Sequence, residues 1–208
     1  MKRIALGAAL LLLPMCGCVP LLSLHPLWDE AIRVDAPELC GTWVVPDGDE
    51  TLEIRDSGDS RYQAVYTAVE HTKAVSSRYL LHAAKLGSHL FLDLEPDEST
   101  FEECAKAEAF LPVVHAHFFA RAVVQGDRLV LGVLDDEAFV KKVRADRIDI
   151  NYEARKQDGE EVVLTAATDR IQRFVLAYAE DPDLWNKTEF RRKPGSRPDA
   201  AAVSANPR

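Results

Sequence analysis

Two histidines separated by one residue, His115 and His117, are the side chains whose spacing points most directly to chemistry. On a β-strand they would lie on one face about 7 Å apart, and two imidazoles at that spacing can share a zinc or copper ion. A complete site needs more ligands, and the candidates are His82, His89, Glu102, Glu103 and Glu108. The pair has no cysteine or acidic ligand at the spacing of a metal motif. We therefore expect no tight metal site and no cofactor, and we interpret the pair as sheet residues near a polar rim.

The sequence lacks the short motifs of common enzyme classes. It contains no Gly-x-Ser-x-Gly turn, no glycine-rich phosphate loop, no His-Glu-x-x-His and no Cys-x-x-Cys. Three acidic pairs fall where turns or helix starts are expected, and solvation or helix capping explains them there: Asp135 with Asp136, Glu102 with Glu103, and Glu160 with Glu161. We therefore predict a protein that binds or assembles, not an enzyme.

The amino-terminal residues follow the order of a secretion signal. Lys2 and Arg3 give a positive start, residues 4–13 are apolar, and the small Gly17 precedes Cys18. A transmembrane helix needs roughly 20 apolar residues. The run is shorter than that, which argues against a signal anchor that is never cut.

The stretch MCGC at residues 15–18 resembles the lipobox of bacterial lipoproteins, usually written Leu-x-Gly-Cys. Met15 stands in the place of leucine and Cys16 in the variable place. The resemblance implies that the cysteine after the cut becomes the first residue and carries the lipid. Cutting before Cys18 leaves Cys40 and Cys104 as an even pair, whereas cutting before Cys16 leaves three further thiols. We therefore favour Cys18, with residues 1–17 as the signal peptide and Cys16 as the alternative.

The lipoprotein resemblance also implies a location. Several acyl chains, palmitate among them, would hold the protein stably on a membrane of the bacterial envelope. In that class an Asp after the lipidated cysteine favours retention at the inner membrane, and Val19 stands there instead. The resemblance therefore implies the periplasmic face of the outer membrane.

The charge of the exported chain excludes one class of partner. The sequence has 25 basic and 34 acidic residues, and loss of Lys2 and Arg3 leaves 23 against 34, a net charge of −11. A nucleic-acid binder needs a basic face to neutralise phosphates. We therefore expect no nucleic-acid partner, and instead a membrane contact through the lipid with an envelope protein or a small apolar ligand as partner.

Composition divides the exported chain into three parts. Residues 18–35 form the lipidated end and a tether, which Pro20 and Pro26 interrupt and which either lies along the domain or dips toward the bilayer. Residues 36–193 have the length of one ordinary domain. Residues 194–208 are rich in proline and poor in bulky apolar residues, so we predict a disordered tail.

Short alternating segments and tight turns predict a mainly β fold of the α+β class. The segments form hairpins, so the sheet should be antiparallel, either a barrel or a sandwich with peripheral helices. The predicted strands are residues 39–45, 51–56, 61–69, 78–86, 90–96, 113–124 and 128–134. The possible helices are residues 99–110, 136–145 and 168–180, followed by a turn near 181–185.

The stretch Gly41-Thr42-Trp43 resembles the Gly-x-Trp that opens the barrels of lipocalins and related calycins. The resemblance implies that Trp43 closes the barrel floor under an arginine of a late strand, Arg191 or Arg192. The alternative is that Trp43 is a core aromatic of a β-sandwich.

The same resemblance suggests a carrier of a small apolar ligand. A carrier needs a hollow interior, which we expect to be lined by Phe91, Phe119 and Val130. A filled interior would indicate a scaffold or interaction module instead. A metal-binding lipoprotein remains as a further alternative.

Cys40 and Cys104 can pair if the compartment is oxidising, as the lipoprotein resemblance implies. Their disulfide would close a loop of about 65 residues and stabilise the fold by roughly 4 kcal/mol. Strand alternation places Gly41 and Trp43 on one face and Cys40 on the other, where the helix that carries Cys104 could cover it. The alternative is two buried free thiols.

Overall fold

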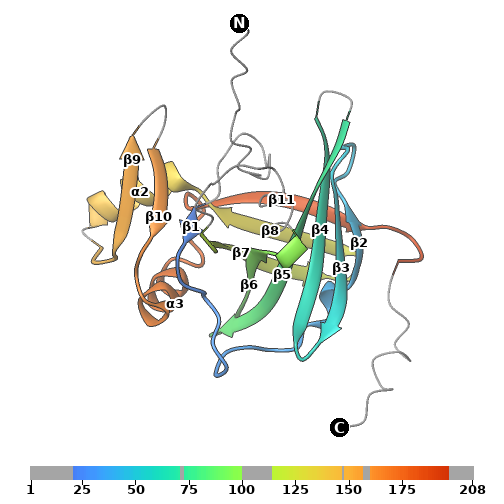
Figure 1. Cartoon of the computed structure of the whole chain (residues 1–208), viewed down its shortest axis with the longest axis horizontal. Helices are drawn as coiled ribbons and strands as arrows, with labels where there is room; N and C mark the ends of the chain where they lie inside the picture. Colours follow the sequence, from blue (N-terminus) through green and yellow to red (C-terminus); the bar gives the residue numbers. More distant parts are fainter. Residues whose placement is uncertain (1–20, 71–72, 100–113, 147, 157–159, 197–208) are drawn as a thin grey trace, which may run out of the picture.

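Eight antiparallel strands close into a barrel in the computed structural model, which describes residues 21–70, 73–99, 114–146, 148–156 and 160–196 (Figure 1). In order around the barrel, its strands are β2 (Gly41–Val44), β3 (Thr51–Gly58), β4 (Arg61–Glu70), β5 (Lys73–Leu86), β6 (His89–Pro96), β7 (His117–Gln125), β8 (Arg128–Leu134) and β11 (Trp185–Arg192). Pairing of β6 with β7 and of β11 with β2 completes the ring. The strands therefore follow one another around the barrel in chain order.

Alternation of buried and less buried side chains is clearest on β4, which has one face on the core. On β4, Tyr62, Ala64, Tyr66 and Ala68 are buried, and the residues between them are half-buried. Several inward positions are alanines, which lets the strands approach across a narrow interior: Ala64, Ala68, Ala83, Ala120 and Ala122. Side chains can fill an eight-stranded barrel of this kind.

A second layer covers one side of the barrel. It consists of α2 (Asp136–Asp146), β9 (Tyr152–Lys156), β10 (Glu160–Leu164) and α3 (Thr168–Ala177), all inserted between β8 and β11 (Figure 1). Asp135 caps α2, because its Oδ1 accepts a hydrogen bond of 2.7 Å from the Ala138 N–H. The buried face of α3 is formed by Ile171, Phe174 and Val175. We call this layer the annex, and a second hydrophobic cluster lies between it and the barrel.

The first described residues run along the outside of the barrel. Strand β1 (Leu22–Ser23) pairs in parallel with β10 and antiparallel with β7, so it joins the annex to the barrel. Leu21 and Leu27 are buried at 1% and 0% exposure. The sequence left open whether the tether lies along the domain or dips toward the bilayer. Residues 21–35 lie along the domain. We call residues 21–35 the strap.

The predicted fold class is confirmed, and the barrel replaces the sandwich alternative. Helices α2 and α3 lie where residues 136–145 and 168–180 predicted them, whereas the helix predicted at 99–110 lies almost wholly outside the described residues. Strands β9, β10 and β11 were not predicted, because their apolar residues show no clear alternation with the charged and polar ones. Strand β7 begins at His117 and not at Val113.

The prediction that Phe91 and Phe119 line the barrel interior is wrong. Phe91 and Phe119 are fully buried, but they belong to the cluster beneath the annex and lie outside the barrel. Their neighbours Leu92, Phe118 and Ala120 face inward. Because both faces of β6 and β7 are covered, apolar residues occupy both faces and their alternation does not identify the inner one.

Candidate functional site

A tryptophan and an arginine pack against each other where β2 pairs with β11. Trp43 is fully buried, and its Nε1–H donates a hydrogen bond of 2.8 Å to the Leu39 carbonyl. Arg192 is the partner of Trp43 in the pairing of β11 with β2, and its guanidinium carbon lies 3.9 Å from the tryptophan ring centroid. A cation over the face of an indole is attracted by the ring and covers it from solvent.

Arg192 also fixes the chain that enters β2. Its Nη1–H donates to the Cys40 carbonyl and its Nη2–H donates to the Glu38 carbonyl, the latter at 2.7 Å. Gly41 makes this approach possible, because a Cβ at that position would lie 2.6 Å from Arg192 Nη1 and the backbone has φ +132°. Arg191 is instead exposed and pairs with Glu189 at 2.8 Å. The structure thus brings together Gly41, Trp43 and Arg192, and leaves Arg191 outside the group.

The barrel interior is nearly filled by side chains of the described residues. It retains a cavity of about 30 Å³, lined entirely by the side chains of Leu52, Tyr66, Tyr79, Leu81, Leu92, Leu94, Phe118, Ala120, Leu131, Val133 and Phe190. A site for a small organic ligand typically has about 300 to 1,000 Å³. The interior as it stands is therefore a packed core with a small residual void.

The outer face of the barrel carries a buried polar cluster. His82, Asp93 and His117 lie on the adjacent strands β5, β6 and β7, with exposures of 3%, 1% and 8%. Asp93 Oδ2 accepts a hydrogen bond of 2.6 Å from the Leu27 N–H of the strap. Its Oδ1 lies 2.8 Å from His117 Nδ1, which donates because an ionised carboxylate can only accept. Asp93 therefore joins a barrel histidine to the strap.

The strap closes this cluster with an aromatic ring. Trp28 stacks on His82 with ring centroids 4.0 Å apart, and the Arg33 guanidinium lies 5.5 Å from the Trp28 centroid. His82 Nδ1 and Trp28 Nε1 are buried and have no hydrogen-bond partner within the described part of the chain. Burial, aided by the charges of Arg33 and Arg61 and opposed by Asp93, lowers the pKa of His82 to about 4. His82 is therefore neutral at physiological pH.

The pKa of His117 is shifted in the opposite direction, upward. Burial works against its charged form, but the hydrogen bond and charge of Asp93 and the charge of Glu95 outweigh burial and raise the pKa of His117. His115 lies before β7, its side chain is 67% exposed, and its Nδ1 is 4.0 Å from Glu95 Oε2. His117 Nε2 lies 3.9 Å from the same oxygen. The two predicted metal candidates therefore share an acidic neighbour.

The other metal candidates do not converge on this pair. His89 lies elsewhere on the outer face, where its Nδ1 is 3.4 Å from Glu180 Oε1. Glu102, Glu103 and Glu108 lie outside the described residues. Among the residues that are described, no group of three or more His, Cys, Asp or Glu side chains could hold a metal ion.

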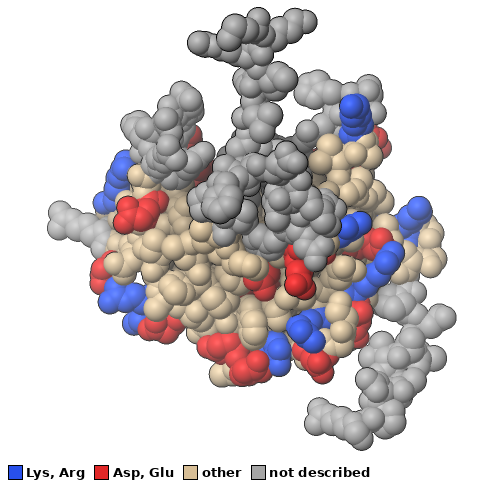
Figure 2. All heavy atoms as spheres, viewed as in Figure 1, with Lys and Arg blue, Asp and Glu red and all other residues tan. Residues whose placement is uncertain are grey.

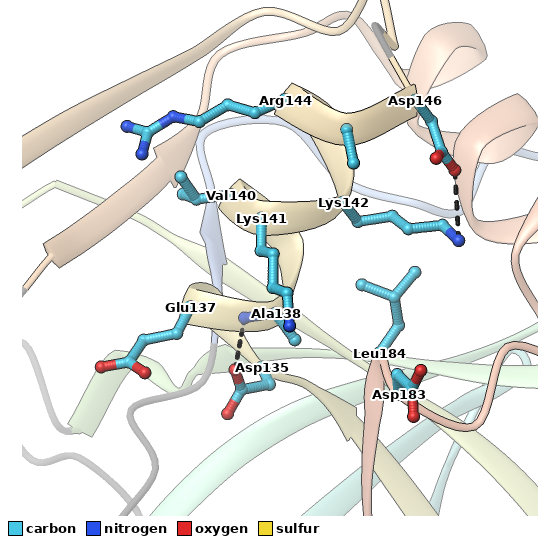
Figure 3. Close-up of a pocket in the computed structure, with 11 residues that line it drawn as sticks. Asp135, Glu137, Ala138, Val140, Lys141, Lys142, Arg144, Asp146, Asp183 and Leu184 are labelled. Atoms are coloured by element: carbon cyan, nitrogen blue, oxygen red, sulfur yellow. Dashed lines mark hydrogen bonds and ion pairs between the residues drawn. The ribbon is translucent and has the colours of Figure 1, made fainter.

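An open groove of about 1320 Å³ runs along α2 (Figure 3). One wall belongs to α2 and the other includes Asp183 and Leu184, and the lining charges have both signs. Lys142 is held by Asp146 at 3.1 Å and by Asp181 at 2.8 Å, whereas Lys141 is exposed. Figure 2 shows the same mixture elsewhere, with acidic and basic side chains interspersed around the rim of the visible face. The described surface seen in that view has no extended basic patch.

The cysteines fall mostly outside the described residues. Cys16, Cys18 and Cys104 belong to that part of the chain, so lipidation and the disulfide stay predictions. Cys40 is buried and forms no disulfide with another described residue, and burial together with the nearby Asp56 raises the pKa of its thiol. Its expected place on the strand face opposite Trp43 is wrong, because both residues belong to the core inside the barrel. The positive φ of Gly41 turns the chain, so strand alternation does not extend back to Cys40.

The polar cluster contains residues that the sequence analysis missed. Asp93 stands alone as an acid within the apolar stretch LFLDL, and a lone charge in a buried strand is a signal for a partnered site. Trp28 and Leu27 have no comparable signal, because only the folded path of the strap brings them to Asp93 and His82.

No protein-family model, no curated protein and no solved structure was found to match this chain. The barrel is compatible with a calycin-like binding module. Among the described residues, no helix is both long and apolar enough to span a bilayer.

Proposed function

We propose that this chain is a lipoprotein of the bacterial envelope, anchored through acylated Cys18, whose barrel acts as a non-catalytic binding or scaffold module. The anchor rests on the positive start, the short apolar run and the MCGC stretch at residues 15–18. Val19 after the lipidated cysteine supports the periplasmic face of the outer membrane. The partner is an envelope protein that contacts the outside of the domain.

One observation carries the scaffold part of this proposal. The cavity that the described residues leave inside the barrel has about 30 Å³, roughly a tenth of the smallest usual ligand site. Contacts with another molecule are therefore left to the outer surface, which bears the strap, the annex and the groove along α2.

The anchor is tested by metabolic labelling with radioactive palmitate in a bacterial host. Label should enter the wild-type chain and the Cys16→Ala variant, and it should be lost in Cys18→Ala. The Cys16→Ala variant is the matched control, because it changes the neighbouring thiol of the same stretch. Label that persists in Cys18→Ala, or a wild-type chain that takes up none, would contradict the assignment.

A carrier of a small apolar ligand is the second candidate. It is favoured by the calycin-like contact of Arg192 with Trp43 and by the wholly apolar character of the lining. A ligand would have to displace interior side chains such as Leu131 and Phe118. Organic extraction of the purified protein followed by mass spectrometry tests this function: a stoichiometric apolar molecule supports the carrier, and its absence supports the scaffold.

A further inference from the structure

We infer that one particular face of the domain lies against the bilayer, namely the side on which Leu21 enters the fold beside the carboxyl end of β8 and the first turn of α2, where Glu137 is exposed. We call it the anchor face. The inference rests on the proposed acylation of Cys18 and adds the orientation of the domain on the membrane. The partner is the lipid surface itself.

The first step is that the chain is fixed to the domain from its first described residue. Leu21 is 1% exposed, and its N–H donates a hydrogen bond of 3.2 Å to the Leu134 carbonyl at the end of β8. Leu22 and Ser23 then pair with β7 on one side and β10 on the other. The strap therefore provides no free tether beyond Leu21.

The second step is the length of chain between the lipid and this fixed point. Leu21 follows Cys18 by three residues. Three fully extended residues span at most about 11 Å. Strand β5 alone has 14 residues, which at a rise of about 3.3 Å per residue corresponds to about 46 Å. The domain is much larger than the reach of its anchor, so the side that carries Leu21 must face the bilayer.

The third step identifies the residues on that side. Leu134 bonds to Leu21, and the next residue, Asp135, donates its N–H to the Leu184 carbonyl at 3.2 Å. Asp136 and Glu137 begin α2. Asp135, Glu137 and Leu184 also lie at one end of the groove in Figure 3. The groove therefore opens beside the membrane surface.

The charge of the anchor face indicates what holds it there. Asp135, Asp136 and Glu137 are acidic, so anionic lipid headgroups would repel this end of α2. The attachment must come from the acyl chains and the short connection. We therefore expect the contact to persist at high salt, which would weaken an electrostatic docking.

Fluorescence quenching in vesicles tests the orientation. The acylated full-length protein, with Cys40→Ala and Cys104→Ala, is reconstituted into phosphatidylethanolamine–phosphatidylglycerol vesicles that contain brominated lipid. A fluorophore is attached at Glu137→Cys on the anchor face or, as the control, at the exposed Ser57→Cys beside the β3–β4 turn. Figure 1 draws that turn at the lower right, across the molecule from β1 and α2.

We expect quenching at least threefold stronger at position 137 than at position 57, unchanged in about 1 M salt. Equal quenching, or stronger quenching at position 57, would overturn the inference. A second variant with ten Gly and Ser residues inserted after Val19 should still float with the vesicles but lose the difference. A protein that does not float with vesicles refutes the acyl anchor instead, so the two failures are distinguishable.

Discussion

The inside of the barrel and the outer face beneath the strap are both buried, but they are built in different ways. The inside is lined by apolar side chains around a void of about 30 Å³, and the charged Arg192 lies over Trp43 in the core. The outer face of β5, β6 and β7 instead buries the polar groups His82, Asp93 and His117.

This difference separates two kinds of specificity. Apolar packing is non-directional and tolerates exchange of one hydrophobic side chain for another of similar volume. Buried polar groups need particular partners at particular distances, so they fix one arrangement. The barrel is thus closed mainly by packing, whereas the place of the strap is set by Leu27 and Trp28 on Asp93 and His82.

The largest effect on stability is expected at Arg192, which covers Trp43 and donates to two backbone carbonyls. Arg192→Ala should lower the free energy of unfolding by about 3 kcal/mol, because the buried carbonyl of Cys40 and the part-buried carbonyl of Glu38 lose their donor and Trp43 loses its cover. Urea unfolding followed by tryptophan fluorescence measures it. Arg191→Ala removes the neighbouring, exposed side chain and should lower the free energy of unfolding by less than about 0.5 kcal/mol. Equal effects of the two substitutions on the free energy of unfolding would contradict a stabilising role for Arg192 over Trp43.

The outer cluster should be disrupted by a nearly isosteric change. Asp93→Asn should cost about 2 to 3 kcal/mol, because an amide can accept from only one of the two donors, Leu27 N–H and His117 Nδ1–H. NMR titration should also show a lower pKa of His117, since the charge that raises it is gone. Glu95→Gln, which removes a more exposed carboxylate, should change stability less. An unchanged His117 titration in Asp93→Asn would contradict the proposed pairing.

The His82 site predicts a loss of stability in mild acid. Its pKa is about 4 in the folded protein and about 6.5 when unfolded, so below pH 6.5 the unfolded chain takes up a proton that folded His82 refuses. The loss begins near pH 6.5, reaches about 2 kcal/mol at pH 5 and grows until pH 4. His82→Phe, which keeps a ring against Trp28, should remove this part of the pH dependence in urea unfolding at pH 7 and pH 5. If His82→Phe lost as much stability between pH 7 and pH 5 as the wild type does, His82 would be charged in the folded protein at pH 5.

His117 provides the matched contrast to His82. Its pKa is raised on folding, so its contribution is fully present below pH 6.5 and is lost as the pH rises through the folded pKa. The two histidines therefore change stability on opposite sides of pH 6.5, His82 below it and His117 above it. The groups that face them are Asp93 and Glu95 on β6, Arg33 on the strap and Arg61 on β4.

The smallest effect is expected inside the barrel. Val133→Ile adds one methylene beside the 30 Å³ void, so the free energy of unfolding should change by less than about 1 kcal/mol, with stabilisation favoured. Thermal unfolding of the two proteins measures it. A loss of more than about 2 kcal/mol would show that the interior is more tightly packed than its void indicates.

Local patterns in the sequence predict much of the barrel but little of its outer layer. The hairpins of β3 with β4 and of β7 with β8 follow from alternation and from turns at glycines, where Gly58 and Gly126 adopt positive φ. The place of α3 follows from the helical spacing of Ile171, Phe174 and Val175. These signals lie within a few residues of one another, so they can be read without knowing the fold.

The remaining features depend on contacts between distant segments. The inner face of β6 could not be identified because Phe91 and Leu92 are both buried, one under the annex and one inside the barrel. The strap shows no period of its own, and its path is set by β7, β10 and Asp93, which come much later in the chain. The contact between Arg192 and Trp43 could be predicted only because the calycin resemblance implied a pair of residues far apart in the sequence.

Native mass spectrometry of the protein released from bacterial membranes in mild detergent tests the central claim most directly. That claim is that Cys18 anchors the chain and that the barrel works through its outside. The predicted mass is that of the chain from Cys18 to its end plus its acyl groups, with no second molecule retained. A stoichiometric apolar ligand, lost when Val133→Trp fills the interior, or a chain without acylation at Cys18, would contradict the account.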